Sequence, residues 1–443
     1  MNLTQNSDQQ TVLDLVGLGV GPFNLSLAAL LDRLPGYSAR FYDRKPSFSW
    51  HPGLMLSGAH MQTSCLKDMV TPVQPTSPWS FISYLVQQER FYQFLATEKT
   101  VISRKEFVDY MSWIAGNLPS LQFNSEIREI DFKEDRFILR FDKKEVKTRN
   151  ICLGTGKMPH VPECTRSYLG EDCFHASELG ARQPDFGGRK IAVVGGGQTG
   201  AEVFLNALRG NWGAATEVQW ISRRPNFEPL DETPFTNEFF TPGYVESFYP
   251  VPASRKSTII KRQKLASDGI TPAYLIEIYR ELYDRTYLSG SPESSWDLLP
   301  DRALAGLSKT GNGRYELMLK NALHDLHEVI QADIVILCTG FEHRLPQYLE
   351  PLQPSLKLDE ESRFQLSSSF RIRWDGPDNR RIYAVNAGMH SHGIAEPQLS
   401  LAAWRSATII NDMAGREVFR VSGPGSLINW QPVSDKKVSA YAA

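Results

Sequence analysis

Two glycine-rich turns, each set between a strand and a helix, most constrain how this chain can fold. The first lies in "DLVGLGVGPFNLSLAALLD", residues 14–32, and the second in "KIAVVGGGQTGAEVFLNAL", residues 190–208. Glycines at such a turn allow a tight bend and a close approach of the backbone to a phosphate, while the free N–H groups of the following helix favour an anion. Two copies in one chain predict two dinucleotide-binding units.

The first copy has the residues of a site for a dinucleotide without a 2′-phosphate. Gly17, Gly19 and Gly21 follow an apolar strand, and Pro22 suits the first helical turn because its missing N–H would have no partner there. The next strand, "ARFYD", ends at Asp43, an acidic residue that can bind a ribose hydroxyl pair. We therefore expect FAD or NAD at this copy.

The second copy has the regular GxGxxG spacing, but its next strand ends in "SRRPNF" instead of an acidic residue. Arginine presents planar donors that match phosphate oxygens, so this copy predicts NADPH. FAD in the first copy and NADPH in the second would make the chain a flavin oxidoreductase. We expect the second cofactor to contact Gly195, Gly197, Gln198, Gly200, Ser222, Arg223 and Arg224.

Composition points to small-molecule chemistry. The 443 residues include 48 Lys plus Arg and 50 Asp plus Glu, with no long basic run, so nucleic acid is not an expected partner. Residues 1–12 lack the features of a secretory signal and no apolar run reaches about 18 residues, which predicts a cytoplasmic protein without a membrane segment. The five cysteines show no CxxC spacing, so neither a redox pair nor a metal site is expected.

The pattern along the chain predicts an α/β fold with two Rossmann-like dinucleotide-binding domains and a small, mainly helical substrate segment. The buried strands in "RNICLGTG" and "ADIVILCTGF" each run into a Thr-Gly turn and are expected to cross between the domains. The predicted FAD domain is discontinuous, at 10–187 and 340–430. The predicted NADPH domain covers 188–225 and 301–339, and the helical insertion covers 226–300.

Several longer segments carry a resemblance to a known family. They are "GVGPFNLSLAAL", "FSWHPGLML", "HMQTSCLKDMVTPVQPTSPWSFISYL", "NICLGTGKMPHVP", "VVGGGQTGAE", "DETPFTNEFFTP" and "HGIAEPQLSLAAWRSA". Together, and in this order, the chain resembles the microbial N-hydroxylating flavin monooxygenases, which hydroxylate the terminal amine of lysine, ornithine or a diamine for hydroxamate siderophores. The resemblance covers nearly the whole chain, from about residue 12 to about residue 430.

The resemblance implies a reaction and a set of residues near the flavin. In this family NADPH reduces FAD, O2 adds at flavin C4a, and a neutral amine attacks the resulting hydroperoxide. Gln62 is implied to lie beside the flavin ring, as the candidate catalytic residue, and to hydrogen-bond to the flavin or the nicotinamide. Trp50 and His51 are implied cofactor contacts, and Trp50, Trp79 and Phe81 are candidates for a dry wall that keeps the amine uncharged.

The resemblance also implies contacts at the substrate and at the flavin pyrimidine. Lys67 matches the lysine that binds the substrate carboxylate in ornithine-hydroxylating members, and Asn237 matches an asparagine of the same site. A helix starting at Pro397 would face the flavin with Leu399 and Ser400, its dipole stabilising negative charge. Three carboxylates are candidates to bind a second substrate ammonium: Asp231, Glu232 and Asp268, of which we favour Asp268.

The segment "HMQTSCLKDMVTPVQPTSPWSF" resembles diamine-hydroxylating members of the family more than ornithine-hydroxylating ones, although the lysine hydroxylases share "HGIAEPQLSL". The resemblance therefore favours a diamine, cadaverine or putrescine, over L-lysine, and places ornithine third. A lysine in the pocket would repel the second ammonium of a diamine, so Lys67 argues for an amino acid if it points inward. More distant alternatives are a Baeyer-Villiger type of flavin monooxygenase, a disulfide reductase and a non-catalytic nucleotide-binding regulator. O2 is the expected co-substrate, and members of this family lead us to expect a homodimer or homotetramer.

Overall fold

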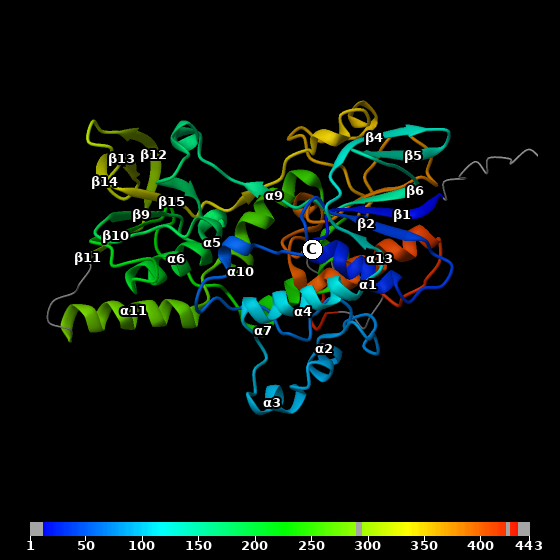
Figure 1. Cartoon of the computed structure of the whole chain (residues 1–443), viewed down its shortest axis with the longest axis horizontal. Helices are drawn as coiled ribbons and strands as arrows, with labels where there is room; N and C mark the ends of the chain where they lie inside the picture. Colours follow the sequence, from blue (N-terminus) through cyan, green and yellow to red (C-terminus); the bar gives the residue numbers. More distant parts are fainter. Residues whose placement is uncertain (1–11, 289–294, 422–425, 433–443) are drawn as a thin grey trace, which may run out of the picture.

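The chain folds into two α/β halves that lie side by side in Figure 1. This computed structural model describes residues 12–288, 295–421 and 426–432. The expectation about residues 1–11, and the parts of the predicted domains that fall on 289–294 and 422–425, lie outside the described residues. The α/β class predicted from the two glycine turns is confirmed.

The first half is built on a sheet that is parallel at its centre and antiparallel at one edge. Its strand order is β3 (Leu121–Gln122), β2 (Ala39–Tyr42), β1 (Leu13–Leu18), β6 (Glu145–Leu153), β5 (Arg136–Phe141) and β4 (Ile127–Lys133), and β17 (Ile382–Ala384) also pairs with β6. β17 comes from the C-terminal part of the chain, so this half is discontinuous in sequence.

Alternating side chains of β1 enter two separate cores on the two faces of this sheet. Leu15 packs in the core that α1 (Pro22–Leu31), α4 (Arg104–Asn117) and α13 (Ala402–Ala414) form on one face. Val16 packs on the opposite face, against apolar side chains of the segment 349–372. This period of two is the usual pattern of a strand buried on both faces.

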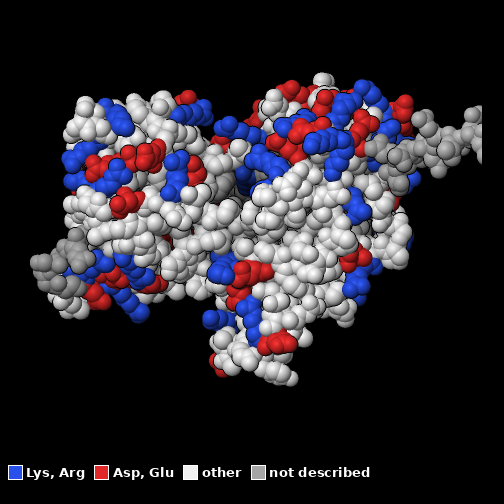
Figure 2. Space-filling model, in the orientation of Figure 1, with Lys and Arg blue, Asp and Glu red and all other residues white. Residues whose placement is uncertain are grey.

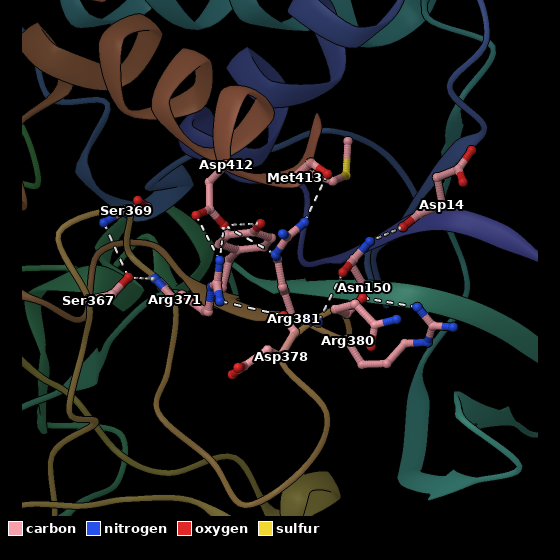
Figure 3. Close-up of polar contacts among 12 residues, drawn as sticks. Asp14, Asn150, Ser367, Ser369, Arg371, Asp378, Arg380, Arg381, Asp412 and Met413 are labelled. Atoms are coloured by element: carbon pink, nitrogen blue, oxygen red, sulfur yellow. Dashed lines mark hydrogen bonds and ion pairs between the residues drawn. The ribbon is translucent and has the colours of Figure 1, made fainter. Parts of the chain in front are cut away.

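The C-terminal end of α13 is fixed to the sheet by a charged network, shown in Figure 3. Asp412 accepts two hydrogen bonds from Arg371 Nη2, at 2.8 and 3.0 Å, and lies 3.5 Å from Arg381 Nε. Arg381 also donates to the Met413 carbonyl, and its own N–H donates to Asn150 of β6. The two arginines offset an acid at a helix C-terminus, where the dipole disfavours it, and so hold the helix in place.

The second half contains a five-stranded sheet that is parallel throughout. Its order is β11 (Ser295–Leu299), β10 (Glu217–Ile221), β9 (Lys190–Val194), β15 (Ile334–Leu337) and β8 (Cys173–His175). The predicted boundaries are wrong at two of these strands. β8 was expected in the first domain and β11 in the helical insertion, but the partners that place them in this sheet, β15 and β10, are distant in sequence.

Two small sheets complete the second half and its link to the first. β12 (Arg302–Lys309), β13 (Tyr315–Asn321) and β14 (Leu326–Ala332) form an antiparallel meander that leads into β15. β7 (Met158–Pro159) and β16 (Phe341–Glu342) pair with each other directly after β6 and β15. The two chain crossings between the halves therefore lie side by side.

The remaining helices surround the two halves, and α2 and α3 project from the lower edge in Figure 1. They are α2 (Phe81–Gln87), α3 (Phe91–Ala96), α5 (Leu179–Arg182), α6 (Gln198–Leu208), α7 (Pro234–Asn237), α8 (Pro242–Phe248), α9 (Ala253–Arg262), α10 (Leu265–Asp268), α11 (Pro272–Tyr287) and α12 (Met389–His392). Helices α7 to α11 lie within residues 226–300, the range predicted for the helical insertion. Within the described ranges, no helix has the length and apolarity needed to span a bilayer.

Gly17→Val should abolish FAD retention. Gly17 lies inside β1, and a Cβ at this position would be 2.1 Å from Cδ1 of Phe41 on β2. Overpacking of this kind costs about 1–3 kcal/mol in unfolding free energy and displaces the adjoining turn. The measurement is FAD content together with thermal melting of the purified protein.

Gly116→Ala is the matched control, because its Cβ would meet nothing within 4 Å in α4. It should keep its flavin, with stability unchanged or raised by up to about 1 kcal/mol. A yellow, fully loaded Gly17→Val protein with the parent melting temperature would contradict the packing argument.

Candidate functional site

The carboxyl ends of the parallel strands of both sheets open into one cavity of about 1880 Å³. Its lining includes both glycine turns, the turn after β6 and the turn after β15. Figure 2 shows Lys and Arg side chains gathered beside the hollow between the two halves. The basic residues of the lining are Arg44, Lys45, Arg128, Lys157, Arg223, Arg224, Lys264, Arg302 and Arg344. A cavity at the ends of parallel strands, with cationic walls, suits dinucleotide phosphates.

The first glycine turn is shaped for close approach of a phosphate. Gly19 has a φ of +82°, and a Cβ there would lie 2.5 Å from the Gly154 carbonyl oxygen. The amide of Asn24 holds the turn from inside by donating to the Gly19 carbonyl at 2.8 Å. Gly21 caps α1, and Pro22 is its first residue, as predicted. Gly19, Gly21 and Pro22 all line the cavity, so this turn fits a pyrophosphate at the helix N-terminus.

Two residues predicted to contact the cofactor at the first turn, Gly17 and Asp43, also have structural roles within the protein. Gly17 is not part of the lining, because it lies in the strand and makes room for Phe41. Asp43 does line the cavity, but its carboxylate also accepts N–H bonds from Val20, at 2.7 Å, and Lys45, at 2.9 Å. Asp43 therefore shapes the glycine turn in addition to its predicted role at the ribose.

The second glycine turn repeats this arrangement. Gly195 has a φ of +143°, and a Cβ there would lie 2.1 Å from the Cys338 carbonyl oxygen. Gly197 caps α6 and Gln198 is its first residue; both line the cavity together with Gly195. Gly200 lies behind the turn, where a Cβ would be 1.9 Å from the Gly195 carbonyl oxygen, so its role is close packing of the helix on the turn. This turn also fits a dinucleotide phosphate.

The arginine-rich end of β10 is divided between the cavity and the protein interior. Arg223 and Arg224 line the cavity, and Arg224 Nη2 donates to the Asp268 carbonyl at 3.0 Å. Ser222 was expected to contact the cofactor, but its side chain is buried outside the lining and accepts a bond from the Arg224 N–H at 3.1 Å. The Ser222 hydroxyl therefore orders the turn that carries the two arginines.

Trp50, His51 and Gln62 lie on the wall of the main cavity. The contact with the cofactor that the resemblance implied for each of them stays a prediction. Burial lowers the pKa of His51 to about 4, assisted by the positive charges of Arg104 and Lys45, so its ring is neutral near pH 7. Gln62 Nε2 donates to Gln198 Oε1 at 3.4 Å and to Thr271 Oγ1 at 3.2 Å.

The expected aromatic wall is only partly present. Trp50 lines both the main cavity and a smaller one beside it. Trp79 donates to Asp32 and packs on Trp113, while Phe81 is fully buried in the core of the first half, and neither lines either of these two cavities. Periodicity cannot distinguish a core aromatic from one at a pocket.

The segment before α13 differs from the predicted helix. The resemblance placed a helix start at Pro397, but Gln398 is extended, a 3₁₀ turn follows at Leu399–Leu401, and α13 begins at Ala402. Pro397 and Leu399 line both cavities, and Ser400 lines the smaller one. The Ser400 hydroxyl is buried without a hydrogen-bond partner among the described residues, so it is available to a bound molecule.

The smaller cavity, of about 230 Å³, adjoins the main one and combines the predicted substrate residues Lys67 and Asn237 with Gln62. Asp268 was expected here, but it ends α10 and lines the main cavity near Gly197. The other two candidate carboxylates, Asp231 and Glu232, do line the smaller cavity.

Arg104 also lines this cavity and was missed by the sequence analysis. It follows Ser103, the cap of α4, so its local sequence is that of an ordinary helix start. Only a long-range contact with the second half distinguishes it.

Arg223→Ala/Arg224→Ala should sharply reduce the preference for NADPH over NADH. Removing two guanidinium groups from a phosphate site removes charge-assisted hydrogen bonds of about 1.5–3 kcal/mol each, about 3–6 kcal/mol together, so the ratio of kcat/KM values should fall by roughly 100-fold to 10,000-fold. Steady-state kinetics with both nucleotides measure this ratio. An unchanged ratio would exclude the two arginines from the 2′-phosphate site.

Comparisons with known proteins agree with this geometry. Residues 11–343 match the family described as L-lysine 6-monooxygenase/L-ornithine 5-monooxygenase. An L-lysine N6-monooxygenase from Escherichia coli is 45% identical over 421 residues, which are 95% of this chain and 98% of that protein.

Two solved structures are similar over nearly their whole length. The FAD-bound cadaverine monooxygenase of desferrioxamine biosynthesis from Erwinia amylovora has a TM-score of 0.89 at 29% identity, covering 96% of this chain and 100% of that one. An ornithine N-hydroxylase from Kutzneria sp. 744, solved with reduced FAD, NADP⁺ and L-ornithine, has a TM-score of 0.83 at 26% identity, covering 91% and 99%. The resemblance found in the sequence is confirmed: the chain belongs to the L-lysine 6-monooxygenase/L-ornithine 5-monooxygenase family, NADPH-dependent flavin enzymes that N-hydroxylate amines for siderophore biosynthesis.

Proposed function

We propose that this enzyme hydroxylates the terminal amine of L-lysine. The observation that carries the proposal is the ammonium of Lys67 at the smaller cavity. Its side chain is half-buried, burial lowers its pKa, and no carboxylate of the described chain forms an ion pair with it. A partly desolvated cation without a counter-ion favours an anionic ligand, and the α-carboxylate of an amino acid supplies one.

The other charges of the smaller cavity suit a zwitterion. Asp231 and Glu232 are exposed carboxylates on its wall, and they can receive the α-ammonium that accompanies the carboxylate. Two cationic side chains, Arg104 and Lys67, line this cavity. Arg104 is already paired with Glu202, so Lys67 is the one available for the substrate carboxylate. Opposite charges on two sides of one small pocket fit the head group of an amino acid.

The proposal differs from the preference for a diamine that the resemblance favoured, and it rests on the charge of Lys67. A second ammonium about 4 Å from Lys67 would be repelled by about 4 kcal/mol at the dielectric typical of a protein surface. The 45% identity to an L-lysine N6-monooxygenase supports the same choice. Cadaverine remains the second candidate, because Asp231 and Glu232 can also receive an ammonium and a cadaverine monooxygenase has a TM-score of 0.89.

The residues of the chain orient the amine and control its protonation. Bound FAD and NADPH supply the reducing power that activates O2 for oxygen transfer. An amine of pKa about 10.4 must lose its proton to react, and apolar walls favour its neutral form. Trp50, Leu230, Phe240 and Leu399 provide such walls in the smaller cavity. With the carboxylate at Lys67, the far end of the substrate extends toward Gln62, which borders both cavities.

The proposal is tested by giving the FAD-loaded enzyme L-lysine, cadaverine, putrescine and L-ornithine in parallel. Hydroxylamine product is measured beside NADPH and O2 consumption. Product from L-lysine, with little from the other three, is the expected result. If only a diamine gives product, the proposal of L-lysine is wrong and the diamine is the substrate.

Lys67→Ala should lower kcat/KM for L-lysine by roughly 10-fold to 100-fold, since an ionic hydrogen bond contributes about 1.5–3 kcal/mol. The same change should leave residual turnover of cadaverine unchanged or raised, because it removes a repulsive charge. Lys133→Ala, which removes an exposed lysine of β4, is the control and should alter neither rate. Equal losses for both amines would mean that the Lys67 ammonium does not meet the substrate carboxylate.

A further inference from the structure

A buried ion pair joins the two halves of the molecule. Arg104 is the first residue of α4, in the first half, and Glu202 lies on α6, directly after the second glycine turn. The guanidinium binds the carboxylate with two hydrogen bonds, Nη2 to Oε1 at 2.9 Å and Nη1 to Oε2 at 3.1 Å. The Glu202 side chain is fully buried and that of Arg104 is 13% exposed. The fork geometry makes this a strong and directional contact.

The ion pair continues into a chain of amides that reaches the cofactor cavity. Glu202 Oε1 also accepts from Gln198 Nε2 at 3.0 Å. On its other side, Gln198 Oε1 accepts from the Thr271 N–H at 2.9 Å and from Gln62 Nε2 at 3.4 Å. A continuous hydrogen-bonded path therefore runs from Arg104, at the smaller cavity, to Gln62, at the junction of both cavities.

The charge of Glu202 determines which way these amides face. An ionised carboxylate only accepts hydrogen bonds and a backbone N–H only donates them, so Gln198 must direct its NH₂ at Glu202 and its oxygen at Thr271. That oxygen then receives the NH₂ of Gln62. The Gln62 carbonyl oxygen has no donor among the described residues and is left for a bound molecule.

The same arginine anchors a segment of the first half that penetrates the second. Arg104 Nη1 donates to the Leu54 carbonyl at 2.5 Å, and the Leu54 side chain packs in the core of the second half. Next to it, a Cβ on Gly53 would lie 1.9 Å from the Ser177 carbonyl oxygen, so the two halves meet here without spare room. The ion pair is therefore directly connected to the segment through which the first half packs on the second.

We propose that the Arg104–Glu202 pair positions the two cofactor sites for hydride transfer, by holding the halves in register and by fixing the amide orientation of Gln198 and Gln62. Stability alone is a weak reason for such a pair, because apolar replacements of buried ion pairs are often neutral or stabilising. Fixing how structural elements align with one another is the better attested role of buried polar contacts. The inference rests on the FAD and NADPH chemistry of the family and is independent of which amine is hydroxylated.

The test is the rate at which NADPH reduces the bound FAD without oxygen or amine, followed by the loss of flavin absorbance in a stopped-flow instrument. Glu202→Gln introduces an NH₂ donor that competes with that of Gln198, so the limiting rate should fall by about tenfold or more. FAD content and complete reduction by dithionite should be retained. Glu217→Gln is the control. It removes a carboxylate of β10 that pairs with Lys190 of β9, and its limiting rate should stay within about twofold of the parent rate.

Two further variants decide the question if Glu202→Gln does not fold. Arg104→Lys keeps the charge but loses the fork, and it should slow the limiting rate without loss of flavin. Arg104→Gln/Glu202→Gln should be no slower than either single change, because the two residues act through one contact. Parent rates in a folded, loaded Glu202→Gln or Arg104→Lys protein would overturn the proposal. The proposal would also be overturned if the loss of rate in the double variant equalled the product of the losses in the single variants. A change confined to the KM for NADPH would overturn it as well.

Discussion

The structure depends on one constraint: two glycine turns on separate sheets must open into the same cavity. Each parallel sheet presents its turn at its carboxyl end, where the next helix begins. The two crossings between the halves pair with each other as β7 and β16, which keeps those ends facing a common space. The segment around Leu54 and the Arg104–Glu202 pair then fix the halves against one another. Hydride transfer between two bound dinucleotides requires this arrangement, because the reacting atoms must be held at close range.

The features predicted well from the sequence are those whose chemistry is local. A glycine such as Gly19 or Gly195 is needed where φ is positive and a carbonyl lies within 2.5 Å or 2.1 Å of the missing Cβ, and the flanking strand and helix follow it directly in the chain. The family resemblance added Lys67 and Asn237, which the fold brings into one small cavity although 170 positions separate them. The expected homo-oligomer and cytoplasmic location stay predictions.

The predictions from sequence are wrong where a contact between residues distant in the chain determines the position of a strand or side chain. Pairing with β15 places β8 in the second sheet, and no residue near β8 indicates this. Ser222 has the right position for a phosphate contact but turns inward to accept the Arg224 N–H, while Asp268 offers its carbonyl to Arg224 near the second glycine turn. The sequence reveals which groups are present. Only the fold determines whether each one faces the cavity or the protein.

The central claim is that one space brings both cofactors and an amino acid together, with the carboxylate at Lys67 and the reacting amine at Gln62. A crystal structure of the FAD-loaded enzyme with NADP⁺ and L-lysine tests it most directly. The account predicts the α-carboxylate within about 4 Å of Lys67 Nζ and the terminal nitrogen at the junction of the two cavities, beside Gln62. A lysine bound in the opposite direction, or with its carboxylate away from Lys67, would contradict it.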